Sequence, residues 1–152
     1  MKKEFEKWNN IKQQIHEVGK RKYYHEREVW WCALGVNVGT EQDGSGAEFR
    51  RPVVILRGFG ADTCLVIPLT TSAHQHPMRV PVGMVDDRQA MALLSQIKVV
   101  DTRRLVRKIG YLEKEMFSNL RESARGILWR FSTRLPLARR ARRHLYTHDI
   151  KC

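Results

Sequence analysis

The chain has 152 residues and a formal net charge of +12. This length predicts a single domain, and a hydrophobic fraction of 42% is enough for one compact core without disulfide or metal support. The excess of positive charge predicts a polyanionic partner, but it does not choose among RNA, DNA, an anionic membrane and an acidic protein.

The cysteines argue against a metal or redox site, and the apolar segments argue against a secreted or membrane-spanning protein. Cys32, Cys64 and Cys152 lie far apart, without the C-x-x-C spacing of a metal or redox site, and the first two sit in apolar runs. We therefore expect small buried hydrophobes in a reducing cytoplasm, and no metal or other cofactor. The N-terminus has no apolar signal segment, and no apolar stretch approaches the roughly 20 residues that cross a bilayer, so we expect no membrane association.

Residues 1–27 are expected to form an N-terminal helical extension. Apolar side chains recur there at helical spacing between charged ones, at Phe5, Trp8, Ile11, Ile15 and Val18. This pattern predicts an amphipathic helix over residues 3–18 that packs on the domain. A helix lying on a membrane is the alternative, but the charged face is mixed rather than basic. Residues 19–27 are expected to connect the helix to the domain.

The middle of the chain is rich in β-forming residues. Turn signals such as DGSG at 43–46 and GFGAD at 58–62 separate short runs. These runs cover residues 28–34, 52–56, 63–69, 78–82 and 90–100, the last of which is long enough for two strands. Short strands at this close spacing predict a small closed barrel.

The spacing of the apolar residues changes after Asp101. Asp101 and Thr102 are favourable N-cap residues and Gly110 is a favourable stop, which predicts a short helix between them. A second amphipathic helix is marked by Leu112, Met116, Phe117, Leu120, Ala124, Ile127 and Leu128. Residues 129–152 form a basic tail that contains the helix-breaking Pro136, and we expect it to add phosphate contacts that do not depend on sequence.

Four stretches occur in an order and spacing that is specific as a set. They are E-V-W-W-C-A-L-G-V-N-V-G-T-E-Q at 28–42, R-R-P-V-V-I-L at 50–56, V-I-P-L-T-T-S at 66–72 and, less closely, L-L-S-Q-I-K-V-V-D-T-R-R-L at 93–105. Together they resemble the MazF/PemK toxins of bacterial toxin–antitoxin pairs. The resemblance covers residues 28–128 and implies an SH3-like barrel of the MazF/CcdB type with a C-terminal helix. With the N-terminal helix added, the expected fold class is mainly β (α+β).

The resemblance also implies an activity, which is metal-independent cleavage of single-stranded RNA. It implies a homodimer that is held inactive by a cognate antitoxin with an acidic segment, which would fit the positive charge of this chain. The chemistry can be argued separately, because RNA carries its own nucleophile in the 2′-hydroxyl. An enzyme then has to orient that oxygen, move two protons and neutralise the crowded phosphorane.

The resemblance places the family's catalytic residues on Arg51, Thr70 and Glu41, with Thr71 a close alternative to Thr70. Arg51 suits phosphorane stabilisation, with assistance to the leaving group, because its fork grips two phosphate oxygens. Thr70 is expected to hold a phosphate oxygen, and Glu41 is a candidate base. Further contacts to RNA are expected from Arg50, Gln42, Thr71, His74 and His76.

Each of these residues also has an ordinary structural interpretation. Arg51 can be a surface arginine at a barrel edge, Thr70 can end a strand, and Glu41 can be a loop charge. The two loop histidines can shuttle protons near a scissile phosphate, but exposed histidines without a role are common. Only the family resemblance favours the functional interpretation over these alternatives.

The sequence departs from the family pattern in three places. The loop at 43–50 is longer than the family's short link. Kid-like members carry R-x-D-Q where residues 93–96 read L-L-S-Q, and they carry histidine where this chain has Thr40. The chain must therefore use the arginine–threonine arrangement or be a weaker enzyme. Two other hypotheses stay open, a non-catalytic toxin of this fold that binds a protein such as gyrase, and an inactive nucleic-acid-binding barrel.

Overall fold

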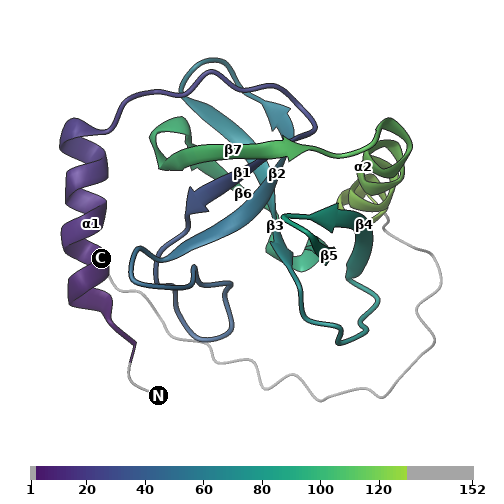
Figure 1. The fold of residues 1–152 in the computed structure, drawn as a ribbon, viewed down its shortest axis with the longest axis horizontal. Helices are drawn as coiled ribbons and strands as arrows, with labels where there is room; N and C mark the ends of the chain where they lie inside the picture. Colours follow the sequence, from purple (N-terminus) through teal and green to yellow (C-terminus); the bar gives the residue numbers. More distant parts are fainter. Residues whose placement is uncertain (1–2, 130–152) are drawn as a thin grey trace, which may run out of the picture.

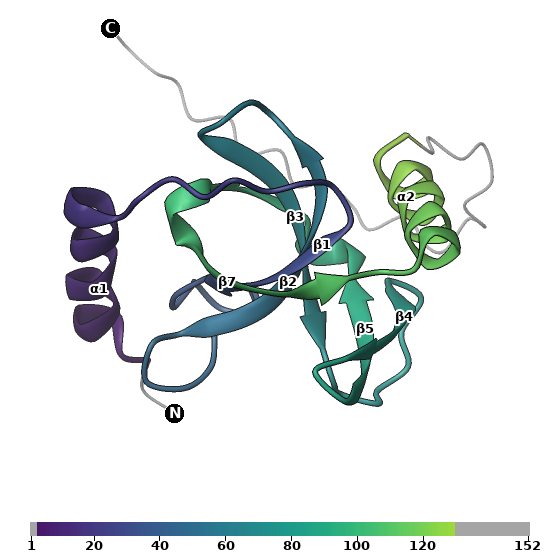
Figure 2. The ribbon, with the colours of Figure 1, turned by 45° about the horizontal axis from the view of Figure 1, so that its top comes forward.

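A curled antiparallel sheet lies between two helices in a computed structural model of the chain, which describes residues 3–129 (Figure 1). Its strands are β1 (Glu28–Ala33), β2 (Arg50–Gly58), β3 (Thr63–Thr70), β4 (Arg79–Val85), β5 (Arg88–Leu93), β6 (Lys98–Asp101) and β7 (Leu105–Tyr111). The strand order is β4-β5-β3-β2-β1-β7, and β6 pairs with β3 beside β5. Figure 2 shows how the sheet curls around its own interior. The expected mainly β, barrel-like fold with a helix near each end of the domain is confirmed.

Each central strand divides its side chains between two hydrophobic clusters. Val53 and Ile55 of β2 point into the curled sheet, whereas Val54 and Leu56 face the helix at the C-terminal side. Alternation along a strand produces this division, and burial on both faces explains why the sequence of β2 reads as a continuous apolar run. Cys32 and Cys64 are fully buried in the inner cluster, where burial raises the pKa of Cys32 to about 12 and that of Cys64 to about 11. Both thiols are therefore packing groups, as expected.

Both predicted amphipathic helices are present. Helix α1 (Phe5–Val18) buries Trp8 against Ala33, Val36 and Phe49, with Ile11 and Ile15 partly buried beside them. Helix α2 (Lys114–Trp129) packs on the outer face of the sheet through Phe117, Leu120 and Ala124. Within residues 3–129, no helix is both long and apolar enough to span a membrane.

The helix predicted after Asp101 is wrong. The carboxylate of Asp101 does accept a hydrogen bond from the backbone N–H of Arg103 at 2.9 Å, as a capping residue would. The helical turn, however, is the single 3-10 turn η2 (Thr102–Arg104), and the chain continues as β7. Pairing of β7 with β1 and complete burial of Leu105 override the local helical signal. The run at 90–100 divides into β5 and β6 around the 3-10 turn η1 (Leu94–Gln96). The basic tail lies outside the described residues apart from its first one.

Glu28 is the only buried carboxylic acid among residues 3–128. Its carboxylate accepts hydrogen bonds from Trp30 Nε1 at 2.8 Å, from the backbone N–H of His25 at 3.1 Å and from Lys108 Nζ at 3.2 Å. Burial alone would raise the pKa of Glu28, but these hydrogen bonds outweigh burial and hold the pKa below its ordinary value of 4.5. The charged carboxylate therefore stabilises the junction of β1 with β7.

Replacing Glu28 with alanine should lower the free energy of unfolding at neutral pH by about 1–3 kcal/mol, because the Trp30 N–H loses its acceptor. Since folding lowers the pKa of Glu28, the contribution of its charge is complete above the ordinary value and is lost as the pH falls through the lower folded value. Urea titrations should therefore show that the free energies of unfolding of wild type and variant differ less in strong acid than at neutral pH. The exposed Glu26 gives a matched control, and a difference that does not shrink in acid would contradict this account.

Candidate active site

Arg51 is held at the start of β2 by two backbone carbonyls. Its Nε donates to the carbonyl oxygen of Asp43 at 2.7 Å, and its Nη1 donates to that of Leu69 at 3.2 Å. The carbonyl of Leu69 belongs to the end of β3, so the guanidinium joins the loop before β2 to the end of the neighbouring strand. Within the described part of the chain, Nη2 makes no hydrogen bond and is left for a ligand.

An open cavity of about 670 Å³ brings Arg51 together with Thr70 and Thr71. Thr70 is the last residue of β3, and its hydroxyl accepts a hydrogen bond from the backbone N–H of Ser72 at 3.2 Å. The hydroxyls of Ser45 and Ser72 also line the cavity. Its volume lies within the range of small-ligand sites, and its lining combines one fixed cation with several hydroxyl groups. Such a combination suits a phosphate group.

Two charged residues of this cavity, Asp86 and Arg88, were not predicted as site residues from the sequence. Asp86 and Asp87 form the two-residue turn between β4 and β5, and both have positive φ, at 53° and 59°. Pairing of β5 with the end of β3 brings this turn beside the threonines. Two consecutive aspartates are typical of a turn, but only the pairing of three strands shows that this turn reaches the same cavity.

The loop before β2 holds Glu41 and Gln42 outside the cavity lining. The Glu41 carboxylate is exposed and accepts a hydrogen bond from the backbone N–H of Val38 at 3.3 Å. Gln42 is fixed by its backbone N–H, which donates to Gln96 Oε1 at 3.0 Å. Lys3, just before α1, forms an ion pair with the Asp43 carboxylate at 2.9 Å. The loop that presents a carbonyl to Arg51 is therefore tied to the N-terminal extension.

Three other predicted RNA contacts do not line the cavity. Arg50 forms an ion pair with Glu48 at 2.7 Å. His74 and His76 are exposed in the loop after β3, where the His74 carbonyl accepts a hydrogen bond from Arg79 and His76 Nδ1 accepts one from the backbone N–H of Met78. Their contacts with RNA remain predictions.

Electrostatics favour an anion in this cavity. Burial lowers the pKa of Arg51 below its usual value, and the nearby Asp43 carboxylate acts in the opposite direction. The guanidinium stays cationic at neutral pH, because arginine does not deprotonate in proteins. In the described residues, Arg88 forms no ion pair, so the cavity has two cations and a single carboxylate, that of Asp86.

The curled sheet, the C-terminal helix against its outer face and the arginine–hydroxyl cavity define a small barrel-like domain with a candidate phosphate site. The chain belongs to the PemK-like, MazF-like toxins of type II toxin–antitoxin systems, because the sequence model of that family matches residues 25–128. A search of curated protein sequences gives no significant match.

Solved structures share the fold at low sequence identity. MazF from Deinococcus radiodurans is 18% identical with a TM-score of 0.59, covering 70% of this chain and 98% of that one. The toxin MazF-mt6 from Mycobacterium tuberculosis is 20% identical with a TM-score of 0.53, covering 67% and 96%. A mycobacterial endoribonuclease in complex with its cognate antitoxin is 15% identical with a TM-score of 0.55, covering 70% and 95%. At these identities the likeness shows the MazF-type fold alone.

Proposed function

We propose that this toxin is an endoribonuclease that cleaves single-stranded RNA through the 2′-hydroxyl of its substrate, without a metal. The observation that carries the proposal is the shared cavity of Arg51 and Thr70, which joins a fixed cation to a hydroxyl at the meeting point of β2 and β3. A structural neighbour of this chain is named an endoribonuclease, which supports the proposal.

In this proposal Arg51 stabilises the phosphorane. Backbone carbonyls fix two of its nitrogens, so the side chain is already oriented before RNA binds and little reorganisation accompanies the reaction. Its remaining nitrogen and Arg88 bind the non-bridging phosphate oxygens, and the Thr70 hydroxyl holds one of them. The 2′-oxygen is thereby kept in line with the leaving 5′-oxygen.

The proton of the 2′-hydroxyl needs an acceptor. Asp86 is the carboxylate that lines the cavity among the described residues, so we assign it this role ahead of Glu41, whose carboxylate lies outside the lining. As the bond from the 2′-oxygen to phosphorus forms, Asp86 takes the proton. The bond from phosphorus to the 5′-oxygen then breaks while Arg51 stabilises the charge on the leaving oxygen. That oxygen takes a proton from a water molecule, and the hydroxide left behind takes the proton from Asp86, which restores the carboxylate. The products are a 2′,3′-cyclic phosphate and a 5′-hydroxyl.

The proposed partners are a second copy of the chain and a cognate antitoxin with an acidic segment. The net charge of +12 favours an acidic inhibitor, and a structural neighbour was solved together with its cognate antitoxin. Complex formation should weaken at high salt, because ion pairs at a solvated surface are screened.

We expect cleavage of an unstructured RNA to proceed at an unchanged rate in excess EDTA, because the proposed mechanism uses arginine in place of a Lewis acid. Gel analysis of a labelled oligonucleotide with and without chelator measures this. Activity that disappears in EDTA and returns with added divalent ion would overturn the metal-independent mechanism. A complete absence of cleavage under both conditions would instead favour the non-catalytic toxin that binds a protein such as gyrase, or the inactive nucleic-acid-binding barrel.

Replacing Asp86 with asparagine should lower kcat by about 10²–10⁴-fold, the usual contribution of a general base. KM should change little or fall, since a negative charge near the RNA backbone is removed. Asp87→Asn is the matched control, because Asp87 shares the turn but does not line the cavity. Equal effects of the two changes, or a large loss in Glu41→Gln with normal turnover in Asp86→Asn, would return the role of base to Glu41.

A further inference from the structure

A long loop, residues 34–49, joins β1 to β2 and presents the Asp43 carbonyl that orients Arg51. Among residues 3–129, its only ladder-type pairing is the isolated bridge between Ser45 and Arg50. The loop also contains four glycines, Gly35, Gly39, Gly44 and Gly46. Glycine loses more conformational freedom on ordering than other residues, so contacts from outside the loop have to hold it in one conformation.

Lys3 supplies such contacts from the N-terminal extension. Its ammonium donates to the carbonyl oxygens of Asn37 at 2.7 Å and Gly39 at 3.1 Å, and it forms an ion pair with the Asp43 carboxylate at 2.9 Å. A lysine ammonium has three donors, so these contacts use all of them. The side chains of Lys3 and Asp43 are only 29% and 31% exposed, which shields the ion pair from solvent. Lys3 therefore binds the loop at three points.

Asp43 is the one residue between Lys3 and Arg51. Its carboxylate binds Lys3 through Oδ2 and accepts a hydrogen bond from the backbone N–H of Asn37 through Oδ1 at 2.7 Å. Its carbonyl accepts from Arg51 Nε at 2.7 Å and from Gln42 Nε2 at 3.2 Å. Because the side chain and the main chain of Asp43 are both fixed, the position of the Lys3 ammonium determines where the carbonyl meets the guanidinium.

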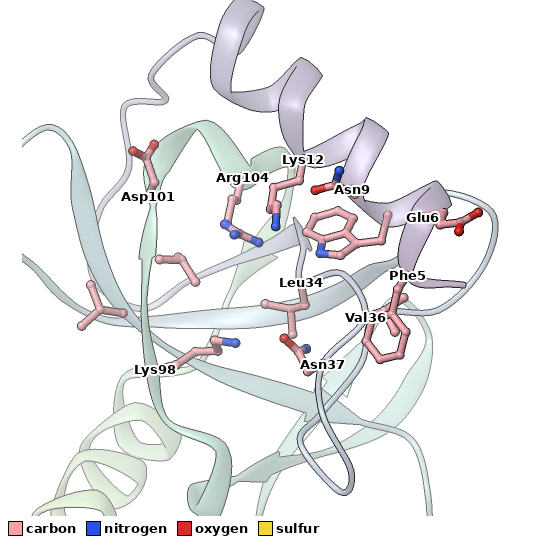
Figure 3. Close-up of a pocket in the computed structure, with 13 residues that line it drawn as sticks. Phe5, Glu6, Asn9, Lys12, Leu34, Val36, Asn37, Lys98, Asp101 and Arg104 are labelled. Atoms are coloured by element: carbon pink, nitrogen blue, oxygen red, sulfur yellow. The ribbon is translucent and has the colours of Figure 1, made fainter. Parts of the chain in front are cut away.

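Helix α1 packs on the same loop near both of its ends. Trp8 contacts Val36 and Phe49, and the ring centroids of Trp8 and Phe49 lie 6.0 Å apart. Gly35 permits this approach, because a Cβ at that position would collide with the Trp8 ring. Figure 3 shows the N-terminal end of α1 beside the loop segment at Val36. The helix thereby places Lys3, two residues before its start, against the loop.

We propose that Lys3 is a positioning residue, which holds Arg51 in the orientation used for cleavage by fixing residues 37–43. The family match begins at residue 25, so it includes neither Lys3 nor α1. The effect on cleavage rests on the proposed function, whereas the effect on Arg51 itself does not. Without Lys3, the Asp43 carbonyl is free to move away from Arg51 Nε, and the guanidinium has to be oriented during the reaction. Direct binding of RNA by Lys3 is less well supported, because its three donors are already used.

The first measurement is the cleavage kinetics of full-length Lys3→Met, a change that keeps the apolar stem and removes the three donors. We expect kcat to fall by about tenfold while KM stays within about twofold of wild type, because the orientation of Arg51 acts on the transition state. Lys12→Met is the matched control. It removes the same charge from α1, at an exposed position that Figure 3 shows beside Arg104, and should leave both constants within about twofold. Circular dichroism melting checks that both variants fold.

The second measurement reports on Arg51 without RNA. In a proton–nitrogen correlation spectrum, the Arg51 Nε–H signal is identified by its loss in Arg51→Lys, and its hydrogen bond to the Asp43 carbonyl slows exchange with water. We expect this exchange to be about tenfold faster in Lys3→Met than in wild type or Lys12→Met, because opening of that hydrogen bond becomes easier.

The two measurements together separate the possible outcomes. Unchanged exchange in Lys3→Met, or equal effects of Lys3→Met and Lys12→Met, would overturn the proposal. A raised KM at unchanged kcat would also overturn it and would make Lys3 a direct contact to RNA. Faster exchange in a protein that cleaves no RNA would reject the proposed function, while the positioning of Arg51 by Lys3 would stand.

Discussion

Replacing Arg51 with alanine should lower kcat/KM for RNA cleavage by about 10³-fold or more, the range found when a preorganised donor or a catalytic arginine is removed. The physical reason is the fixed position of the guanidinium, which two carbonyls hold at 2.7 and 3.2 Å in the cavity that also contains Thr70. The variant should fold, because Arg51 is only partly buried and its strand is anchored by the buried residues Val53 to Leu56. Gel-based kinetics together with circular dichroism measure both properties.

Two further variants make the Arg51 result specific. The Arg51→Lys variant should also cleave RNA slowly, because a lysine ammonium cannot bind two carbonyls in one plane and still reach a phosphate. Arg50→Ala should keep near-normal turnover, because Arg50 pairs with Glu48 and does not line the cavity. Near-normal turnover of either Arg51 variant would remove that residue from the site, and a loss confined to Arg50→Ala would place the catalytic arginine one position earlier.

The central strands could be predicted because their local and tertiary signals agree. Residues 52–56 and 63–69 are apolar runs bounded by turn residues, and both became buried strands of the sheet. Residues 103–110 show the opposite case. Leu105, Val106 and Ile109 fit a helical face as well as a strand, and Asp101 is a genuine cap. Only the pairing of β7 with β1, which is remote in sequence, decides between the two.

Some residues of the candidate site could be predicted from the sequence and others could not. Arg51 and Thr70 were predicted because each lies in a short motif that resembles the family's, and the structure places both in one cavity. Asp86 and Arg88 could not, because no local pattern distinguishes an acidic turn that faces solvent from one that a third strand carries to a cavity. The structure places the Glu41 carboxylate on the backbone of its own loop, outside the cavity lining, so its catalytic role stays a prediction.

A single 2′-deoxy substitution at the cleaved nucleotide should stop the reaction completely, because the proposed mechanism takes its nucleophile from the substrate. The same substitution one nucleotide away is the control and should leave cleavage within about an order of magnitude, since it removes at most one hydrogen bond. Mass spectrometry of the all-ribose products should show a 2′,3′-cyclic phosphate on one fragment and a 5′-hydroxyl on the other. A 5′-phosphate product, or cleavage that continues at the 2′-deoxy position, would identify water as the nucleophile. Asp86 would then have to deprotonate water rather than the sugar, and the in-line placement of the 2′-oxygen by Arg51 and Thr70 would lose its purpose.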